Sequence, residues 1–371
     1  MNKNFILLKM DLDIMSSKKT VQNGENAVFC YIDEIPPFID SALARLYGAL
    51  HSSLPFFRVF RSIEHVSCYV VARNSDPIVI LLFKVENRRI EVLNEMIEID
   101  PEEIDRFTRH VLTKFSQIDI ISFKALKTVA GKIGYPAQKY KSKETYMIEL
   151  PGTPNEYTAS IGKSTRTNIR YQNNNVLRNY SSFSVKFYAN EDIDEQHIRT
   201  IIRFSEQKIR MKDSGFCHNE ENIVRLAKMC GFVCVLMIND RVCAGSINYQ
   251  IGSSYFGEVL GHNVEYDKYG LGKLALHQTI CESIVRGGKK FYLGGGVFDF
   301  KNRMLGVQVS MDELQIYRSY GKLILNFDKA ARTIIYFHVR QLKSWLRQHK
   351  NTFVARCAFK YFYFFKNRIT K

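Results

Sequence analysis

Three apolar segments joined by very short turns constrain the fold of this chain more than any other feature. They span residues 232–238, 241–251 and 255–262. The connections consist of Asn239-Asp240 and of Gly252-Ser253-Ser254. Apolar segments of this length, separated by Asn, Asp, Gly and Ser, predict an antiparallel meander of three strands.

A glycine-rich turn, Gly270-Leu271-Gly272-Lys273, follows the meander and opens a predicted helix that ends near Gly287. Glycines at a strand-to-helix turn let backbone N–H groups approach a ligand, and the helix N-terminus adds about half a positive charge. The turn therefore suits a pyrophosphate. Its spacing is not that of a Walker A loop and it follows a meander, which disfavours ATP-binding and dinucleotide-binding folds. The alternative is a helix entered through flexible glycines without a ligand.

A second glycine motif follows the strand predicted at residues 290–293. Three glycines, 294–296, precede Asp299, Phe300 and Lys301. Consecutive glycines indicate a backbone crowded against something, with a cation presented beside it. Lys301 is placed to stabilise negative charge on a carbonyl under attack or to hold a phosphate. The alternative is a solvated loop lysine.

Glu258 is the candidate general base, because it is the only acid in the apolar strand 255–262. Burial there would raise its pKa towards a useful range. A plain surface-facing glutamate is the other interpretation, and Asp299 is the second candidate for the base. Lys163, Arg166 and Arg170 are spaced three and four residues apart, so they share a helix face that could grip an anionic substrate or simply be solvated.

The whole chain divides into four predicted regions. Residues 1–25 form a polar arm, 26–150 and 151–325 form two domains with Pro151-Gly152-Thr153-Pro154 at the boundary, and 326–371 form a basic, aromatic, helical tail. A length of 371 residues, 46% hydrophobic and 24% charged, allows two compact globular domains.

Between residues 26 and 150 the pattern mixes strands with a helix that begins at Asp100-Pro101, and it shows no catalytic cluster. Beyond the boundary we expect one helix over residues 155–179 and further helices at 194–211 and 219–229.

The eight cysteines form no C-x-x-C pair and no cluster with zinc spacing, so no metal is predicted and a reducing compartment is favoured. The apolar stretch near the N-terminus is too short for a signal peptide, and no apolar run approaches the ~20 residues of a membrane-spanning helix. The prediction is a cytoplasmic protein.

The tail contains eleven Lys/Arg residues and one acid, Asp328, and accounts for much of the net charge of +16. Cations interleaved with aromatic residues suit the surface of an anionic membrane, RNA, or helices packed on the core with solvated lysines. If the tail binds a membrane, the protein would associate with the inner face of the cell membrane.

The ordered set of motifs resembles the GNAT acyltransferase superfamily, in the branch of the CelD-like acetyltransferases and the FemAB aminoacyltransferases. Three pieces carry the resemblance: the basic run 163–170, the turn 266–272, and the glycines 294–296 that lead to Phe300-Lys301. The resemblance implies a tandem α/β (α+β) fold of two GNAT-like mixed sheets flanked by helices, with a degenerate N-terminal copy.

The resemblance also assigns roles to individual residues. Tyr269 and Gly270-Leu271-Gly272-Lys273 would hold the diphosphate of acetyl-CoA or another acyl-CoA, and Lys301 would stabilise the reacting carbonyl. Lys301 is expected within one side chain's reach of the turn. The family's Arg or Gln in the turn is replaced by Asp267, which faces a pyrophosphate unfavourably unless it points away.

The resulting hypothesis is a GNAT-type N- or O-acyltransferase that uses an amine or hydroxyl acceptor, such as a saccharide, an envelope-polysaccharide precursor or a lipid-linked molecule. The absence of a recognisable FemAB helical hairpin favours acyl-CoA as donor over aminoacyl-tRNA. Aminoacyl transfer from tRNA and a non-catalytic protein on a decayed GNAT scaffold remain as alternatives.

Overall fold

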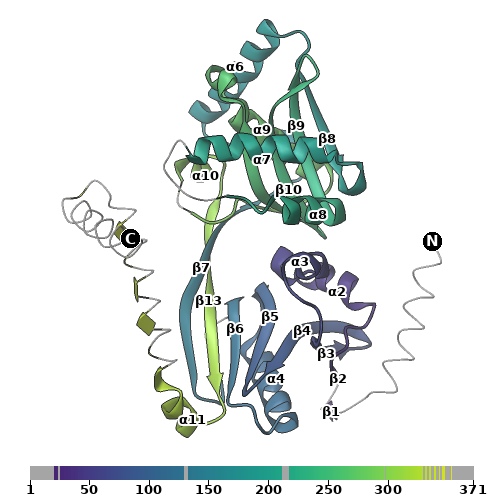
Figure 1. The fold of residues 1–371 in the computed structure, drawn as a ribbon, viewed down its shortest axis with the longest axis vertical. Coiled ribbons are helices and arrows are strands. Elements are labelled where there is room, and N and C mark those ends of the chain that lie inside the picture. Colours follow the sequence, from purple (N-terminus) through teal and green to yellow (C-terminus); the bar gives the residue numbers. More distant parts are fainter. Residues whose placement is uncertain are drawn as a thin grey trace.

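The computed structural model describes residues 21–23, 26–128, 133–210, 217–296 and 298–328, with isolated positions from 331 to 352. The described strands form one mixed 13-stranded sheet in the order β1-β2-β3-β4-β5-β6-β13-β7-β12-β11-β10-β9-β8 (Figure 1). The predicted class, a mixed α/β fold with helices flanking the sheet, is confirmed.

The first half of the chain alternates strands and helices. Its elements are β1 (Val21–Asn23), β2 (Asn26–Tyr31), α2 (Ile39–Leu46), the 3-10 helix η1 (Leu50–Ser52), α3 (Leu54–Phe60), β3 (Ser67–Arg73), β4 (Asp76–Glu86), β5 (Arg89–Glu98), α4 (Pro101–Lys114), β6 (Ile120–Lys127) and β7 (Ala137–Glu149).

The second half repeats this order after two connecting helices. Its elements are α5 (Pro154–Ser160), α6 (Lys163–Asn179), β8 (Ser184–Ala189), η2 (Asn190–Asp192), α7 (Glu195–Arg210), α8 (Glu220–Cys230), β9 (Gly231–Ile238), β10 (Arg241–Ile251), β11 (Ser254–His262), η3 (Val264–Tyr269), α9 (Leu271–Val285), β12 (Lys290–Tyr292), α10 (Asp299–Arg303), β13 (Val307–Tyr317) and α11 (Tyr320–Leu325).

The repeat is visible in the strand pairing. In each half an antiparallel meander, β3-β4-β5 or β9-β10-β11, is followed by a helix, α4 or α9. A strand parallel to the end of the meander comes next, β6 in the first half and β12 in the second. The predicted tandem architecture is thus present, whereas the boundaries at residues 25, 150 and 325 stay predictions.

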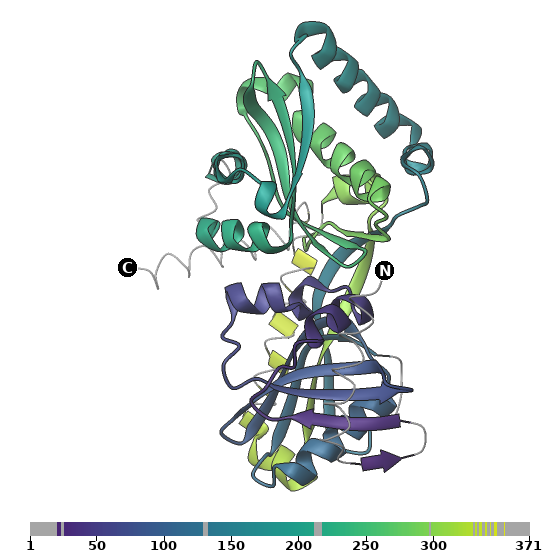
Figure 2. The same ribbon diagram turned by 90° about the vertical axis from the view of Figure 1, so that its right-hand side faces the viewer.

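The last strands of the two halves are exchanged. β7 follows β6 in the chain but pairs with β12, and β13 pairs with β6 of the first half. β7 and β13 also pair with each other along their length. These two long strands run between the lobes and join the two half-sheets into one (Figures 1 and 2).

Helices cover both faces of the second half-sheet. Leu274, Ala275 and Ile280 of α9 pack with α5 and α6 on one face, while α7 and α8 pack on the other. The core cluster that contains the buried residues of α7 and α8 continues into the first half, because it includes Leu50 and Met96. Apolar packing therefore joins the lobes as well as the shared strands.

Several expectations needed correction or fell outside the described residues. The helix predicted over 155–179 is two helices, because Ile161 turns into the core and Ile161 and Gly162 both adopt extended ψ angles, 136° and 139°. The short helix α10 was not predicted. The predicted arm, apart from β1, and most of the predicted tail lie outside the described residues.

Within the described ranges, no helix combines the length and apolar character needed to cross a membrane. The seven cysteines of the described part are all unpaired. In the same part of the chain, no group of three or more His, Cys, Asp or Glu is arranged to hold a metal ion.

Candidate active site

The two parallel strands of the second half separate soon after they meet. Only three residues of β11, Ser254–Phe256, pair with β12, and their partners are Lys290–Tyr292. Beyond Tyr292 the chain stays beside β7, since the N–H of Leu293 donates to the carbonyl of Tyr146 and the N–H of Tyr146 donates to the carbonyl of Gly294. β11 continues to His262 without this neighbour. We call the place where β11 and the glycine segment separate the opening.

The backbone conformation of the glycine segment, residues 294–296, requires glycine at two positions. Gly294 and Gly296 have φ angles of 71° and 86°, in the left-handed region that other residues rarely adopt. A Cβ on Gly294 would lie 3.8 Å from the carbonyl oxygen of Gly257, so this glycine marks the closed end of the opening. The predicted crowding against backbone is found at Gly295, where a Cβ would lie 3.3 Å from the carbonyl oxygen of Glu144, whereas the contact at Gly294 is an ordinary van der Waals distance.

Glu258 lies at a β-bulge beside the closed end. The register between β10 and β11 jumps from Ile247–Val259 to Asn248–Gly257, which leaves Glu258 unpaired. Bulges redirect side chains and are frequent next to active sites. Glu258 is exposed to solvent, as the surface-facing interpretation expects, yet desolvation by the surrounding protein raises its pKa, and Lys143 partly opposes this. A solvent-accessible carboxyl with a raised pKa can still act as a general base.

Lys301 is buried at the same end, with only 3% of its surface exposed. Its ammonium group donates to the carbonyl of Gly294 over 2.9 Å and to that of Gly295, and lies 5.3 Å from the ring centre of Tyr146. No carboxylate of the described residues pairs with it, and burial lowers its pKa to about 8. Two of its three N–H donors are satisfied, so one remains for a ligand.

The N-terminus of α9 lies at the other end of β11. Gly270 adopts a left-handed conformation with φ 63° and caps the helix. Within the described residues, the N–H groups of Leu271 and Gly272 have no acceptor, as expected for the first turn of a helix. Lys273 donates to Asn168 over 2.6 Å, and Arg303 is close enough to lower the pKa of Lys273, after the larger effect of burial.

Side chains pack tightly on both glycines of this turn. A Cβ on Gly270 would lie 2.0 Å from Nε2 of Gln172, and one on Gly272 would lie 2.7 Å from Nδ1 of His262. The buried Oε1 of Gln172 has no hydrogen-bond partner. Tyr269 is buried, so it can offer a ligand its backbone only. The turn needs its glycines because neighbouring side chains already fill the space.

A charged cluster that the sequence did not reveal lies beside the turn. Asp267 accepts a hydrogen bond of 2.7 Å from Nε2 of His262 and lies 3.3 Å from the ammonium of Lys208. The bond to His262 and the charge of Lys208 lower the pKa of Asp267, and burial lowers that of His262. The acid at the family's Arg or Gln position is therefore neutralised by the protein. Lys208 is too distant in sequence for any motif to have signalled this cluster.

The remaining predicted site residues are not gathered here. Arg166 donates to the carbonyls of Ala159 and Ile161, which commits it to the C-terminal end of α5. Lys163 and Arg170 are exposed on α6. The side chain of Asp299 is 90% exposed and lies 4.0 Å from Arg303.

The lysine and the turn lie towards opposite ends of this stretch of β11, and the expectation that one side chain reaches between them stays a prediction. Gly257 marks the closed end and His262 the end beside α9, and five residues of strand span roughly 16 Å. A ligand that contacts both must be long and extended.

Comparisons with known proteins give one family match. The acetyltransferase (GNAT) domain family matches residues 163–302. No curated protein matches the chain. The crystal structure of FemX has a TM-score of 0.58 at 11% identity, over 79% of this chain and 98% of FemX, which shows a shared fold.

Two further solved structures match less closely. A tandem GNAT protein from the clavulanic acid biosynthesis pathway has a TM-score of 0.38 at 8% identity, over 78% of this chain and 98% of that one. The C-terminal domain of a putative lysylphosphatidylglycerol synthetase from Agrobacterium fabrum has a TM-score of 0.40 at 9% identity, over 68% of this chain and 84% of that one.

Proposed function

We propose that this protein transfers an acyl group from an acyl-CoA to an amine or hydroxyl acceptor. The observation that carries the proposal is the opening beside β11, with a buried, carboxylate-free lysine at its closed end and unpaired helix N–H groups at the other. An acyl-CoA is long and extended, carries a carbonyl at one end and a diphosphate further along, and so matches both ends.

The donor diphosphate would lie at the N-terminus of α9. The N–H groups of Leu271 and Gly272 would donate to it, and Lys273 would supply positive charge. Asp267 is no obstacle in this arrangement, because the ammonium of Lys208 balances its charge and His262 donates a hydrogen bond to it.

The reacting groups would act from opposite faces of the opened sheet. Lys301 belongs to α10, and Met304 after that helix packs in the cluster of α9. Glu258 instead lies near Tyr249, which packs with α7 and α8. A donor lying in the opening would thus meet the lysine on one side and the acceptor with its base on the other.

The chemistry balances with these two residues. Glu258 takes a proton from the acceptor as its nitrogen or oxygen attacks the thioester carbonyl. The free N–H of Lys301 donates to the oxyanion that forms. Collapse of this intermediate breaks the C–S bond, and coenzyme A leaves as its thiol after accepting a proton.

The acceptor class follows from the earlier expectations. A saccharide, an envelope-polysaccharide precursor or a lipid-linked molecule would bring its amine or hydroxyl to the Glu258 side. Residues 326–371 would bind an anionic membrane surface, placing the protein at the inner face of the cell membrane. A variant ending at Asn326 should then no longer co-sediment with anionic vesicles, and unchanged sedimentation would exclude the membrane contact.

One observation favours aminoacyl transfer from charged tRNA as a second candidate. Helix α6 carries four cations and no acid, with Lys163 and Arg170 exposed beside Tyr171, which is 64% exposed. Cations and an exposed aromatic ring suit RNA. The third alternative, a non-catalytic protein on a decayed GNAT scaffold, requires neither acyl-CoA nor charged tRNA.

Calorimetric titration separates the candidates. We expect acetyl-CoA and coenzyme A to bind with a 1:1 stoichiometry, followed by acceptor-dependent release of coenzyme A on a panel of amino sugars and polyprenyl-linked sugars. Binding of tRNA without coenzyme A would favour the second candidate, and binding of neither would leave only the non-catalytic alternative.

A further inference from the structure

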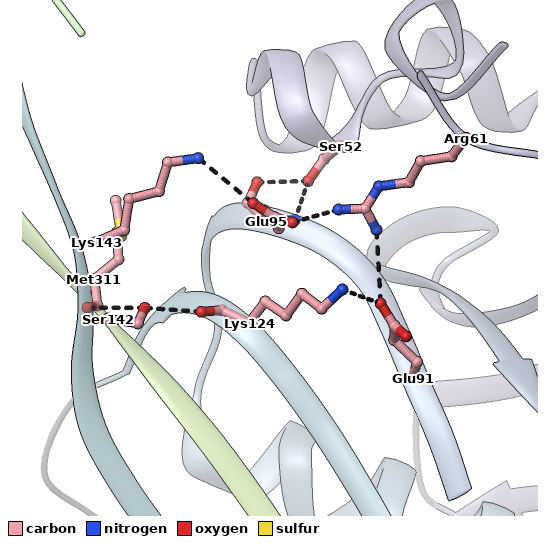
Figure 3. Close-up of polar contacts among 8 residues, drawn as sticks. All are labelled: Ser52, Arg61, Glu91, Glu95, Lys124, Ser142, Lys143 and Met311. Atoms are coloured by element: carbon pink, nitrogen blue, oxygen red, sulfur yellow. Dashed lines mark hydrogen bonds and ion pairs between the residues drawn. The ribbon is translucent and has the colours of Figure 1, made fainter. Parts of the chain in front are cut away.

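Glu95 of the first half is the centre of a charged network near the lobe junction (Figure 3). It is buried and lies on β5, where it forms ion pairs with Arg61 of α3 and, over 3.5 Å, with Lys143 of β7. The hydroxyl of Ser52 donates to its backbone carbonyl over 2.7 Å and accepts from its N–H over 3.0 Å. The position of this carboxylate is therefore fixed through backbone and side chain together.

The backbone at Glu95 departs from regular strand geometry. The register of β5 with β6 shifts on both sides of Glu95. The next residue, Met96, is buried with φ 61°, a left-handed conformation that a long side chain rarely adopts. Such conformations persist where the surroundings require them, often at functional positions. The first half thus holds one carboxylate against Lys143 at a conformational cost.

Lys143 also faces the site of the second half. Gly294 lies beside Gly257, and a Cβ on Gly295 would lie 3.3 Å from the carbonyl oxygen of Glu144. Of the described residues at this register, Gly294 and Gly295 lie between β11 and β7, which are two strand spacings of about 10 Å apart. Lys143 is close enough to Glu258 to favour its ionised form.

We propose that Glu95 positions Lys143, and that Lys143 in turn controls the charge state of Glu258, so that the first half tunes the proposed base of the second. This inference rests on the proposed function. Glu95 and Glu258 compete for one ammonium group. The stronger the hold of Glu95, the less Lys143 favours the ionised form of Glu258.

The surroundings of both carboxylates fit this competition. Burial raises the pKa of Glu258, Lys143 opposes that rise, and Tyr249 of β10 faces the same carboxyl. On α7, Ile201, Phe204 and Ser205 pack on Gly261 near the end of β11, and Lys208 contacts His262. The pKa of Glu95 stays below its ordinary value despite burial, because Lys143, Arg61 and His51 all favour its charge.

Two substitutions should move the pH profile in opposite directions. Lys143→Met removes the cation, so the acid limb of kcat should shift to higher pH. Glu95→Gln releases Lys143 towards Glu258, so the acid limb should shift to lower pH. A merely structural role would lower kcat at every pH without moving the limb. Lys143→Arg, which keeps the charge, should restore the limb towards its original position.

Lys124→Met is the matched control. Lys124 pairs with Glu91 in the same network but does not contact Glu95. Replacing Lys124 removes one positive charge, as replacing Lys143 does. The acid limb of kcat in the Lys124→Met variant should stay in place. Thermal unfolding of each variant identifies any that fail to fold, and Glu95→Gln, which keeps a hydrogen-bond acceptor, is the mildest of them.

A second readout works without any substrate. Carbon-13 NMR titration of glutamate carboxyls, with Glu258→Gln to assign the resonance, reports the ionisation of Glu258 in the free protein. Shifts of opposite sign in the Lys143 and Glu95 variants would support the inference, even if no acyl transfer were found and the proposed function failed. An unmoved titration in both variants would overturn it, whether or not transfer occurs.

Discussion

The two halves of the molecule share an element order but differ where the active site would form. In the first half β5 pairs with β6 along the strand. The pairing begins where Arg89 lies opposite Ile120 and ends where Glu98 lies opposite Lys127. In the second half β11 pairs with β12 over three residues and then separates. The same topology is therefore closed in one copy and open in the other.

The helices that follow the two meanders, α4 and α9, also differ in how their first turns could bind an anion. Helix α4 begins after Asp100 with Pro101-Glu102-Glu103, so its first turn lacks one N–H and carries acids. Helix α9 begins after Gly270 with Leu271-Gly272-Lys273. Acids satisfy the positive end of a helix internally, whereas glycines and a lysine leave it available to an anion. If the proposed function holds, a few local residues, and not the fold, decide which copy binds the donor.

The largest expected effect comes from Lys301→Met in the open copy. Removing an oxyanion donor typically costs about 100- to 1000-fold in kcat. We expect that loss in acceptor-dependent release of coenzyme A, with the Kd for acetyl-CoA changed less than about twofold. A parallel loss of donor affinity would show that Lys301 binds the donor instead of stabilising the reaction.

Making the start of α9 resemble that of α4 should have the next largest effect. Lys273 corresponds in position to Glu103, so Lys273→Glu places an acid in the first helical turn. Loss of one charge-assisted contact, worth about 1.5–3 kcal/mol, predicts roughly 10- to 100-fold weaker binding of acetyl-CoA by calorimetry. Lys186→Glu, on the edge strand β8, is the control for net charge, and equal weakening there would refute a local role.

The pH dependence of the open copy gives a further test. Burial lowers the pKa of Lys301 to about 8, and only the charged form is a strong donor to an oxyanion. Lys301 is protonated below pH 8, so kcat should fall about tenfold per pH unit above it. Lys301→Arg stays charged and should lose this alkaline limb, which a pH-rate profile would reveal.

The smallest effect is expected in the closed copy. Changing Glu102 and Glu103 together to Lys makes the start of α4 basic but leaves β5 and β6 paired along their length. Calorimetry should still show one acetyl-CoA per chain and less than about a twofold change in Kd. A second binding event would mean that the acids alone had closed this copy.

The sequence predicted the parts of the molecule that depend on local pattern. The meander 232–262 and the helix after Gly270 follow from periodicity and turn residues, whereas the tandem order was implied by the family resemblance, and all are present. The helix expected over 155–179 failed at Ile161, because its burial in the core overrides the local helical pattern.

The sequence did not predict contacts between residues far apart in the chain. Gln172 against Gly270 and Lys208 beside Asp267 connect elements whose packing is set only by the complete sheet. The pairing of Glu95 with Lys143 likewise depends on the exchange of β7 into the second half. The sequence therefore indicated candidate residues for the site, whereas the charge partners of these residues could not be predicted from it.

The exchanged strands restrict how such a protein can be divided. A cut near residue 150 would separate β12 from β7 and leave β6 without β13, opening unpaired sheet edges in both fragments. Neither copy can then be recombined or inherited as an independent module. The first half supplies β7 to the sheet of the second half and receives β13 in return, so each half-sheet is complete only in the presence of the other.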